Sequence, residues 1–342
     1  MAKIREFAGL RPSGTLAPQV AELPYDVVSS EEARAIAKNR PHSFFHISKP
    51  EIDLPADISL YDDSVYAKAR ENFERFIGDG VLRADDEPGL YLYTLVMNGR
   101  EQTGLVGCLD IDDYLEGRIK KHELTREDKE RDRMRHLDNL SAQTGLVFTF
   151  YREDGSGRPL FDRALEFTPE FDFTADDGIR HILRRVGDGA LISSFKELLR
   201  PRPLYIADGH HRYETALNYR QWLHNQKPEL MPDHPSNFIM MYLCPVQDQG
   251  LIILPAHRLL SDIPGPVRSD FLHKAKAYFD IRPFPVEPVK TDPRLATLRE
   301  SMTPHPGQNK IGLFIKDHPD FMVLSLKPGI MAQFFENTII AP

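Results

Sequence analysis

The chain has 342 residues, of which 41% are hydrophobic and 27% are charged. This length exceeds one average domain, so we expect two units, or one core with a large insertion, in a soluble protein with a sizeable core. The formal net charge is −8 and there is no basic block. A broad nucleic-acid-binding face is therefore not indicated, whereas a local phosphate pocket remains compatible with this charge.

The cysteines and the apolar runs bear on the compartment. Cys108 and Cys244 are far apart and have no partners at zinc-site spacing, so we expect reduced, buried thiols in a cytoplasmic protein. We find neither a signal peptide nor an apolar run of membrane length, and we expect no membrane partner.

The N-terminal stretch predicts one helix and one strand. Residues 29–32 (Ser-Ser-Glu-Glu) have the composition of an N-cap and predict a helix over 33–38. Asp26 then lies in a loop or at a strand end, either as a turn acid or as a site residue. Alternating Phe45 and Ile47 indicate a strand that carries His46, which is either structural or catalytic.

The next elements are predicted from periodicity. Residues 61–77 have the pattern of a long amphipathic helix, closed by a Gly-Asp-Gly sequence. Residues 89–97 and 101–109 predict a hairpin around Asn98-Gly99, because this pair favours the turn that joins two antiparallel strands.

A charged stretch follows. Thr125 and Asp128 approximate a capping box, so residues 126–133 are predicted to be helical, and their mixed charges are typical of a solvated face. His122 and Glu123 precede this cap, in a loop or at a strand end, where a general base can be presented. Residues 141–148 predict a turn into a buried strand.

Residues 204–217 are the most informative stretch. The apolar run 204–207 predicts a buried strand, Asp208-Gly209 favours a tight turn, and helical spacing begins at Tyr213. The polar cluster 208–212 therefore lies where a strand leads into a helix. At such a junction the N–H groups of the first turn lack intrahelical partners and the helix dipole is positive, which favours phosphate.

Each residue type in this cluster suits such a site, although simpler roles exist. Gly209 permits close backbone approach, Arg212 can fork onto phosphate oxygens, and Asp208 can hold a metal or a hydroxyl proton. Alternatively, Asp-Gly is common turn or N-cap chemistry. Adjacent helical residues point about 100° apart, so His210 and His211 rarely bind one ion together. The density of polar groups after a buried strand favours a site.

The remaining sequence predicts further elements of the core and then a smaller second unit. Residues 190–199 predict a helix, and residues 238–244 and 251–254 predict strands. The proline-rich stretch 263–266 indicates a boundary, which gives a core over residues 1–262 and a smaller α/β portion over 263–342.

Several motifs together carry a family resemblance. The stretches are, in this order, Leu23-Pro24-Tyr25-Asp26-Val27, Lys121-His122-Glu123-Leu124-Thr125 with Asp132-Arg133, Ala142-Gln143-Thr144-Gly145 and Ile206-Ala207-Asp208-Gly209-His210-His211-Arg212. Up to about residue 260 the chain resembles the bacterial family catalogued as domain of unknown function 1015, which is placed in the ParB/sulfiredoxin-like superfamily. The resemblance implies an α+β fold, with a ParB/sulfiredoxin-like core and an insertion at about residues 85–200.

The superfamily implies a function. Its members include kinases that phosphorylate free serine with ATP or ADP, sulfiredoxins, and CTP-binding chromosome-partitioning proteins, and the turn corresponding to Gly209–Arg212 holds nucleotide phosphates. The Asp-Gly-His-His-Arg form resembles the serine kinases, and no cysteine stands in the turn for sulfiredoxin chemistry. Two departures are Leu124, where many relatives have Arg or Lys, and an end at Pro342, where relatives continue for several dozen residues. We therefore expect a shortened C-terminal portion.

We expect nucleotide-dependent phosphoryl transfer on a small hydroxyl metabolite, free serine or phosphoserine first, with ATP or ADP and Mg²⁺. The direction stays open between a serine kinase and a phosphoserine phosphotransferase or phosphatase, and a homodimer is compatible with either. The expected site comprises a phosphate cradle of Gly209, His210, His211 and Arg212, Asp208 for Mg²⁺ or the hydroxyl, Glu123 as general base, and His122 and Asp26. The alternative is a nucleotide-gated, ParB-like switch that binds DNA or a partner without turnover.

Overall fold

The computed structural model describes residues 3–123, 125, 127–252, 257–285, 300–303 and 308–335. It divides the chain into two units, Met1–Ile253 and Leu254–Pro342. The prolines taken to mark a boundary at residues 263–266 lie inside the second unit. Pro264 is the N-cap residue of helix α10 (Gly265–Ala275) and Pro266 stands in its first turn, where a missing N–H costs nothing.

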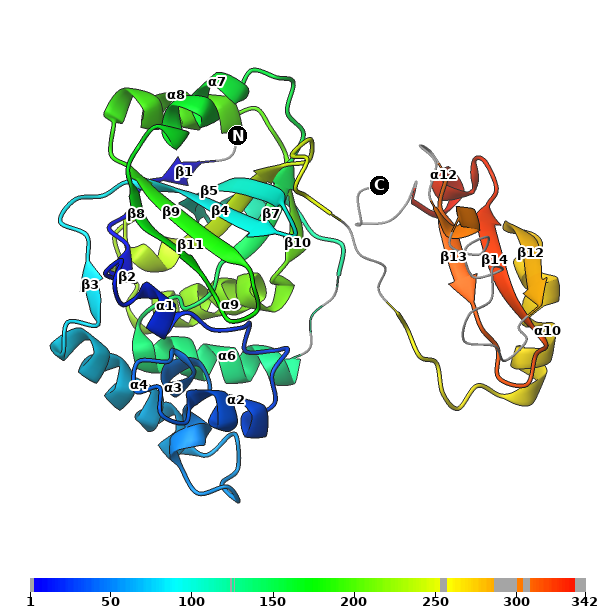
Figure 1. Ribbon diagram of the computed structural model, residues 1–342, viewed down its shortest axis with the longest axis horizontal. Coiled ribbons are helices and arrows are strands. Elements are labelled where there is room, and N and C mark those ends of the chain that lie inside the picture. Colours follow the sequence, from blue (N-terminus) through cyan, green and yellow to red (C-terminus); the bar gives the residue numbers. More distant parts are fainter. Residues whose placement is uncertain are drawn as a thin grey trace. The chain divides into compact units, whose positions relative to one another are not determined.

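A nine-stranded mixed sheet forms the centre of the larger unit (Figure 1). Its path runs β6-β10-β7-β11-β5-β4-β9-β8, and β1 pairs with β5. The strands are β1 Ile4–Arg5, β4 Leu90–Met97, β5 Arg100–Asp110, β6 Ile119–Lys120, β7 Val147–Tyr151, β8 Pro169–Thr174, β9 Arg180–Val186, β10 Leu204–Asp208 and β11 Phe238–Pro245. The pairs β6–β10 and β7–β11 are parallel and the others antiparallel. The expected α+β class is confirmed, and strands from residues 85–200 form most of this sheet.

The predicted hairpin is confirmed as β4 and β5, which pair in antiparallel register from Tyr91–Val106 to Met97–Arg100. Asn98 and Gly99 both have positive φ, 52° and 75°. Such angles match the right-handed twist of the flanking strands, and Asn and Gly adopt them most readily. The local sequence therefore determined this element.

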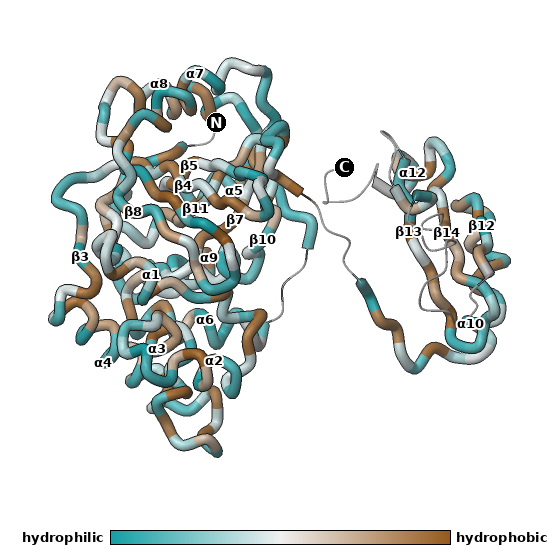
Figure 2. The backbone as a smooth tube through the Cα atoms, viewed as in Figure 1, coloured by the Kyte–Doolittle hydropathy of each residue, from teal (hydrophilic) through white to brown (hydrophobic). Residues whose placement is uncertain are grey.

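The two faces of the sheet carry different apolar clusters, because alternate side chains point to opposite sides. Leu90 and Leu92 join the main core, which the helices α7 (Arg158–Leu165) and α8 (Gly189–Leu199) complete. Tyr91 and Val106 belong to a second cluster on the other face. Figure 2 shows the hydrophobic backbone segments concentrated in these central strands.

Three helices are stacked beside the sheet (Figure 1). Helix α9 (His210–Gln226) packs against α6 (Glu127–Leu140), and α6 packs against α4 (Asp63–Gly78). The remaining short elements of the larger unit are β2 Leu10–Pro12, α1 Ala17–Val20, α2 Ser30–Ala37, α3 Phe45–Ser48, η1 Pro50–Asp53, β3 Leu82–Ala84, α5 Asp112–Leu115 and η2 Pro235–Asn237.

The N-terminal predictions were partly wrong. Ser29 caps α2 in a full capping box with Glu32, as its composition predicted, although the helix begins at Ser30. The strand expected around residues 45–49 is instead the helix α3. Phe45 and Ile47 are both fully buried, so their alternation reflects burial of a single turn. His46 contacts Asp53 (2.9 Å) and the Arg40 carbonyl (3.1 Å), a structural arrangement.

The solvated face expected for residues 126–133 is confirmed only in part, at the exposed Glu127 and Arg131. Helix α6 lies between α9 and α4, and the side chains of Asp132 and Arg133 are only about one-fifth exposed. Asp132 accepts a hydrogen bond from the Tyr66 hydroxyl (2.7 Å) and pairs with Arg133 (3.1 Å), and such partners make partial burial of charge tolerable. The capping box expected at Thr125 and Asp128 falls partly outside the described residues.

The smaller unit has an antiparallel sheet in the order β12-β14-β13, formed by Phe279–Pro285, Asp320–Leu326 and Lys310–Leu313. Helices α10 and α12 (Ile330–Phe335) accompany it, and Ala275, Met322 and Leu324 form its core. The strand expected at 251–254 is not present at 251–252, and its other half lies outside the described residues.

Cys244 is buried and Cys108 partly buried, both are free thiols, and burial raises the pKa of each to about 12. Of the helices that the structure describes, none is long and apolar enough to cross a membrane.

Candidate functional site

The predicted strand–turn–helix junction is confirmed. Strand β10 ends at Asp208, Gly209 has a φ of +95°, and α9 begins at His210. A Cβ atom at Gly209 would lie 3.0 Å from Nε of Arg212 and 3.3 Å from Cα of Val147, so both the angle and the space require glycine. Because Gly209 has no side chain, the N-cap residue itself does not cap the amides of the first turn.

Arg212 is fixed beside this turn. Its Nη1 donates to the Leu146 carbonyl at 2.6 Å, and its Nη2 pairs with Oδ2 of Asp208 at 2.5 Å. Gly145 makes room for the side chain, since a Cβ there would lie 3.2 Å from Cδ of Arg212. The carboxylate of Asp208, about two-thirds exposed, is thus paired with a guanidinium.

His210 forms a separate cluster with His122 and Glu123. Oε2 of Glu123 lies 3.7 Å from Nδ1 of the buried His210, and the rings of His122 and His210 meet edge to face at 4.5 Å between centroids. The His122 backbone N–H donates to Nε2 of His210 at 3.4 Å. Burial, and then the neighbouring His122, lower the pKa of His210, which favours a neutral ring with Nε2 as acceptor.

This cluster has the donors of a metal site. The ligand atoms of His122, Glu123 and His210 lie within 4.8 Å of one another, and among the described residues it is the group of His, Cys, Asp and Glu side chains that could hold an ion. Two imidazoles with one carboxylate suit zinc, iron or manganese, whereas Mg²⁺ prefers oxygen ligands. Asp208, expected to bind the metal, is not a member of the group.

The expected site residues therefore divide into two subsites. Residues 210 and 212 project about 200° apart around a helix, so His210 meets Glu123 whereas Arg212 points towards Gly145. Glu123 and Asp208 both lie close enough to favour the charged form of His210. Asp26 is an exposed turn residue outside this cluster, and His211 is partly buried.

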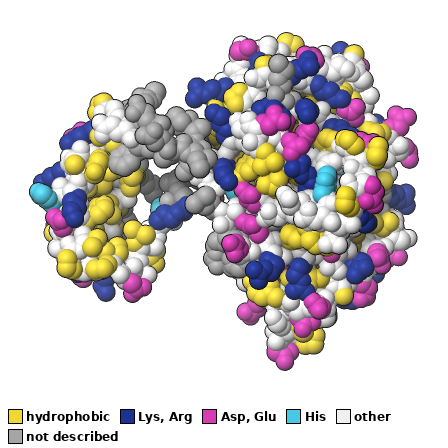
Figure 3. All heavy atoms as spheres, turned by 180° about the vertical axis from the view of Figure 1, so that it is seen from behind, with side chains coloured by type: hydrophobic (Ala, Val, Ile, Leu, Met, Phe, Trp, Pro, Cys, Tyr) yellow, Lys and Arg dark blue, Asp and Glu magenta, His cyan; other side chains and the backbone are white. Residues whose placement is uncertain are grey.

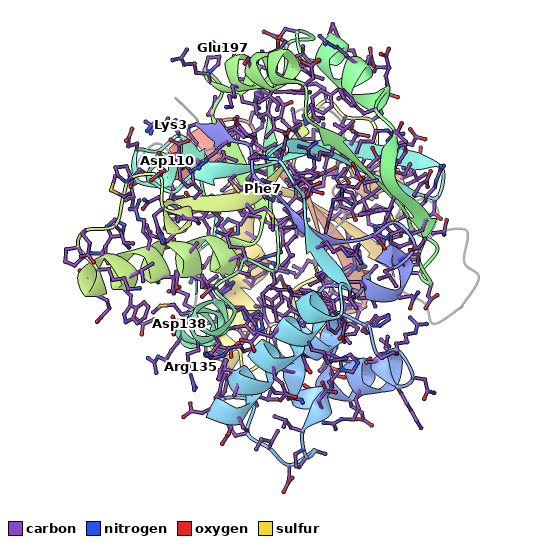
Figure 4. The ribbon with its side chains drawn as sticks, turned by 90° about the vertical axis from the view of Figure 1, so that its left-hand side faces the viewer. Lys3, Phe7, Asp110, Arg135, Asp138 and Glu197 are labelled. Carbon is purple, nitrogen blue, oxygen red and sulfur yellow. The ribbon has the colours of Figure 1, made fainter. Side chains whose placement is uncertain are left out.

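A cavity of about 960 Å³ lies within the larger unit, bordered by Arg212 and Asp26. Most of its lining is apolar and comes from the second face of the sheet and the N-terminal segment, including Tyr91, Met240 and Phe7. Phe7, which is labelled in Figure 4, is partly buried. The volume is at the upper end of the range for small-molecule pockets and is sufficient for a nucleotide.

Two contributors to this region had no predicted role. The ring of Tyr25 lies under the Arg133 guanidinium at 4.1 Å. Gln143 bonds the Phe238 carbonyl (2.7 Å) and the Met240 N–H (2.8 Å), which fixes the segment before Gly145 to strand β11. Both residues belong to motifs that carry the family resemblance. That membership is the feature of the sequence that could have identified them as part of the site.

The comparisons with known proteins identify a family. A model described as "Protein of unknown function (DUF1015)" matches residues 4–340. No curated protein and no solved structure matches the chain. Since the family model covers nearly the whole chain, the protein belongs to this family.

Proposed function

From its membership of this family and the geometry around Gly209, we propose that the protein transfers a phosphoryl group between an adenine nucleotide and a small hydroxyl metabolite. Free serine or phosphoserine is the first candidate, on a ParB/sulfiredoxin-like core. The observation that carries the proposal is the glycine-capped start of α9 with Arg212 beside it. A helix N-terminus that begins with glycine and a neighbouring guanidinium together suit the binding of phosphate.

The adjacent residues supply the other functions of the reaction. The cavity of about 960 Å³ next to Arg212 has room for a nucleoside and a second substrate. Glu123, about 60% exposed, takes the hydroxyl proton as general base. The ring of His210 lies beside that carboxylate, with its Nδ1 3.7 Å from Oε2 of Glu123.

The carboxylate of Asp208 suits a magnesium ion that arrives with the nucleotide. Mg²⁺ is usually held by one or two carboxylates together with substrate phosphates, and Asp208, about two-thirds exposed, offers such oxygens. When bound, the ion neutralises phosphate charge. In our proposal Asp208 exchanges its pairing with Arg212 for this role.

The direct test is to incubate the protein with serine or phosphoserine, Mg²⁺ and each adenine nucleotide, and to follow phosphate by ³¹P NMR. We expect conversion that depends on both the nucleotide and the serine compound. Nucleotide binding without turnover of any small hydroxyl compound would favour a nucleotide-gated switch instead.

Surface charge argues against the DNA-binding form of that switch. The face in Figure 3 shows Lys and Arg side chains interspersed with Asp and Glu side chains, in keeping with the net charge of −8. We expect no salt-sensitive shift with generic DNA.

A further inference from the structure

A second, smaller cavity of about 60 Å³ is lined by residues of α6 and α9. Arg212, Tyr25 and Gln143 line both cavities, so the small one adjoins the large one. One water needs about 10–15 Å³ of such volume. The small cavity therefore has room for a compact group such as a phosphoryl or a carboxylate.

Two guanidinium groups border this cavity, Arg133 from α6 and Arg212 from α9. Within the described part of the chain, Arg133 uses Nε and Nη2 on Asp132, and Arg212 uses Nη1 on Leu146 and Nη2 on Asp208. Each guanidinium has five N–H donors. Both side chains are only about one-fifth to one-quarter exposed, which strengthens their attraction for an anion.

A buried hydroxyl gives independent evidence for a ligand. Thr215 is 4% exposed, and its Oγ1 has no hydrogen-bond partner although it lines the cavity. A threonine inside a helix commonly satisfies its hydroxyl on the carbonyl one turn earlier. Leaving such a group unpaired costs about 1–3 kcal/mol, so an oxygen acceptor in the cavity would stabilise it.

His136 also lines this cavity and is uncharged at neutral pH. His136 is 95% buried from solvent and bonds the Ile47 carbonyl through Nε2 at 2.9 Å. Burial, and then the charge of Arg133, lower the pKa of His136 to about 4. The positive charge facing the cavity therefore comes from the two arginines.

We propose that Arg133, Arg212 and Thr215 form a pocket for the oxyanion group of the small-molecule substrate, whose remaining atoms extend into the large cavity. The pocket is additional to the first-turn amides of α9, which bind the nucleotide. The inference rests on the proposed function only through Arg212, because this side chain would lie between the nucleotide phosphates and the oxyanion group of the substrate. It assigns Arg133 and Thr215 to substrate recognition.

Calorimetric titrations of the full chain, without nucleotide, test the pocket. The probes are phosphoserine, phosphoethanolamine (which lacks the carboxylate) and serine (which lacks the phosphoryl group). Binding of phosphoethanolamine but not serine would identify the bound group as phosphoryl, and the reverse result as carboxylate. Failure of all three probes to bind would overturn the pocket.

Variants locate the binding. We expect Arg133→Gln to weaken binding of the active probe roughly 10- to 100-fold, and Thr215→Val roughly 3- to 10-fold, since a charged donor contributes more than a hydroxyl. Thr215→Ser should retain affinity because it keeps the hydroxyl. Arg131→Gln removes the same charge from an exposed position of α6 and should bind as wild type.

The outcomes separate this inference from the proposed function. Arg133→Gln should leave ADP affinity unchanged, and probe binding that depends on Arg133 would support the pocket even if no turnover were found. Wild-type probe affinity in both Arg133→Gln and Thr215→Val would refute it. If circular dichroism shows that Arg133→Gln is unfolded, the Thr215→Val and Thr215→Ser pair decides.

Discussion

At the scale of single residues, Arg212 connects the parts of the site. It bonds Leu146, pairs with Asp208, and borders both cavities. Arg212→Ala should weaken nucleotide binding by about 1–3 kcal/mol, the range for a charge-assisted hydrogen bond, as measured by calorimetry. Arg220→Ala is the control, because Arg220 on the same helix pairs with Asp112 (2.7 Å) and lines neither cavity. Equal nucleotide affinity in Arg212→Ala and wild type would remove it from the site.

Glu123→Gln tests the general base. The amide keeps the shape but cannot accept a proton, so turnover should fall roughly 10²–10⁴-fold with little change in nucleotide affinity. Asp208→Asn should instead reduce both turnover and Mg²⁺-dependent nucleotide binding. Steady-state kinetics distinguish the roles, with Glu166→Gln on the exposed surface of α7's C-terminus as control.

If Glu123 has only a surface role, we expect different effects of Glu123→Gln on stability and turnover. Lys121, one of its neighbours in sequence, pairs with Glu214 instead (3.1 Å). Glu123 would then contribute at most about 1 kcal/mol to stability and nothing to rate. Near-native turnover in Glu123→Gln would therefore contradict its assignment as base.

Glu22 gives a pH dependence that can be measured without a substrate. Its Oε1 accepts a bond from the Ser48 hydroxyl (2.6 Å), its Oε2 has no partner, and burial raises its pKa from 4.5 to about 8. The folded protein therefore holds a proton that the unfolded chain releases near pH 4.5. This stabilisation is complete below pH 4.5 and is lost as the pH rises to about 8, by up to about 1.4 kcal/mol per pH unit.

Urea unfolding at pH 6.5, 7.25 and 8 checks this. We expect the free energy of unfolding of the wild type to fall over this window, and Glu22→Gln to reduce the fall. The pKa of His136 is lowered from 6.5 to about 4 on folding. Its contribution therefore makes stability rise with pH only between about pH 4 and 6.5, below this window. Identical slopes for wild type and variant would show that Glu22 is ionised in the folded protein.

At the scale of elements, the turn between β10 and α9 determines where both subsites lie. Gly209→Ala should destabilise the protein by about 1–3 kcal/mol through backbone strain, and it should displace Arg212, because the new Cβ would be 3.0 Å from Nε. Chemical denaturation measures the first effect and nucleotide titration the second.

Gly178→Ala is the matched control. Gly178 also has positive φ, +80°, but nothing lies within 4 Å of its Cβ position. It should show the strain cost while nucleotide affinity stays at the wild-type value. A loss of affinity in Gly178→Ala as large as in Gly209→Ala would mean that general destabilisation, rather than the turn, controls binding.

At the scale of the whole molecule, each unit has its own apolar core. Residues 257–262 form neither helix nor strand, and Leu259 and Leu260 are 95% and 75% exposed. Chymotrypsin should cleave there first. Because the residues that line the cavities or are assigned to the site all precede residue 241, the N-terminal fragment should keep its circular dichroism and its nucleotide affinity. A fragment that unfolds on cleavage would show that the larger unit depends on the smaller one.

The sequence by itself determined the elements whose causes are local. Asn98-Gly99 produced the hairpin, Ser29 and Glu32 capped α2, and the change of period after Asp208 located the turn before α9. In each case the decisive contacts join residues a few positions apart, so backbone sterics and capping act before any tertiary contact forms.

Tertiary structure decided the rest. Phe45 and Ile47 became a buried helical turn rather than a strand, and the charged helix α6 became an inner element because Tyr66 and Tyr25 lie beside its charges. The expected single site divided in two, since His210 and Arg212 project from opposite sides of the first turn of α9 and meet different partners. Those partners are distant in sequence, and only the packing of α9 against α6 and the sheet brings Glu123 to His210 and Arg133 close to Thr215.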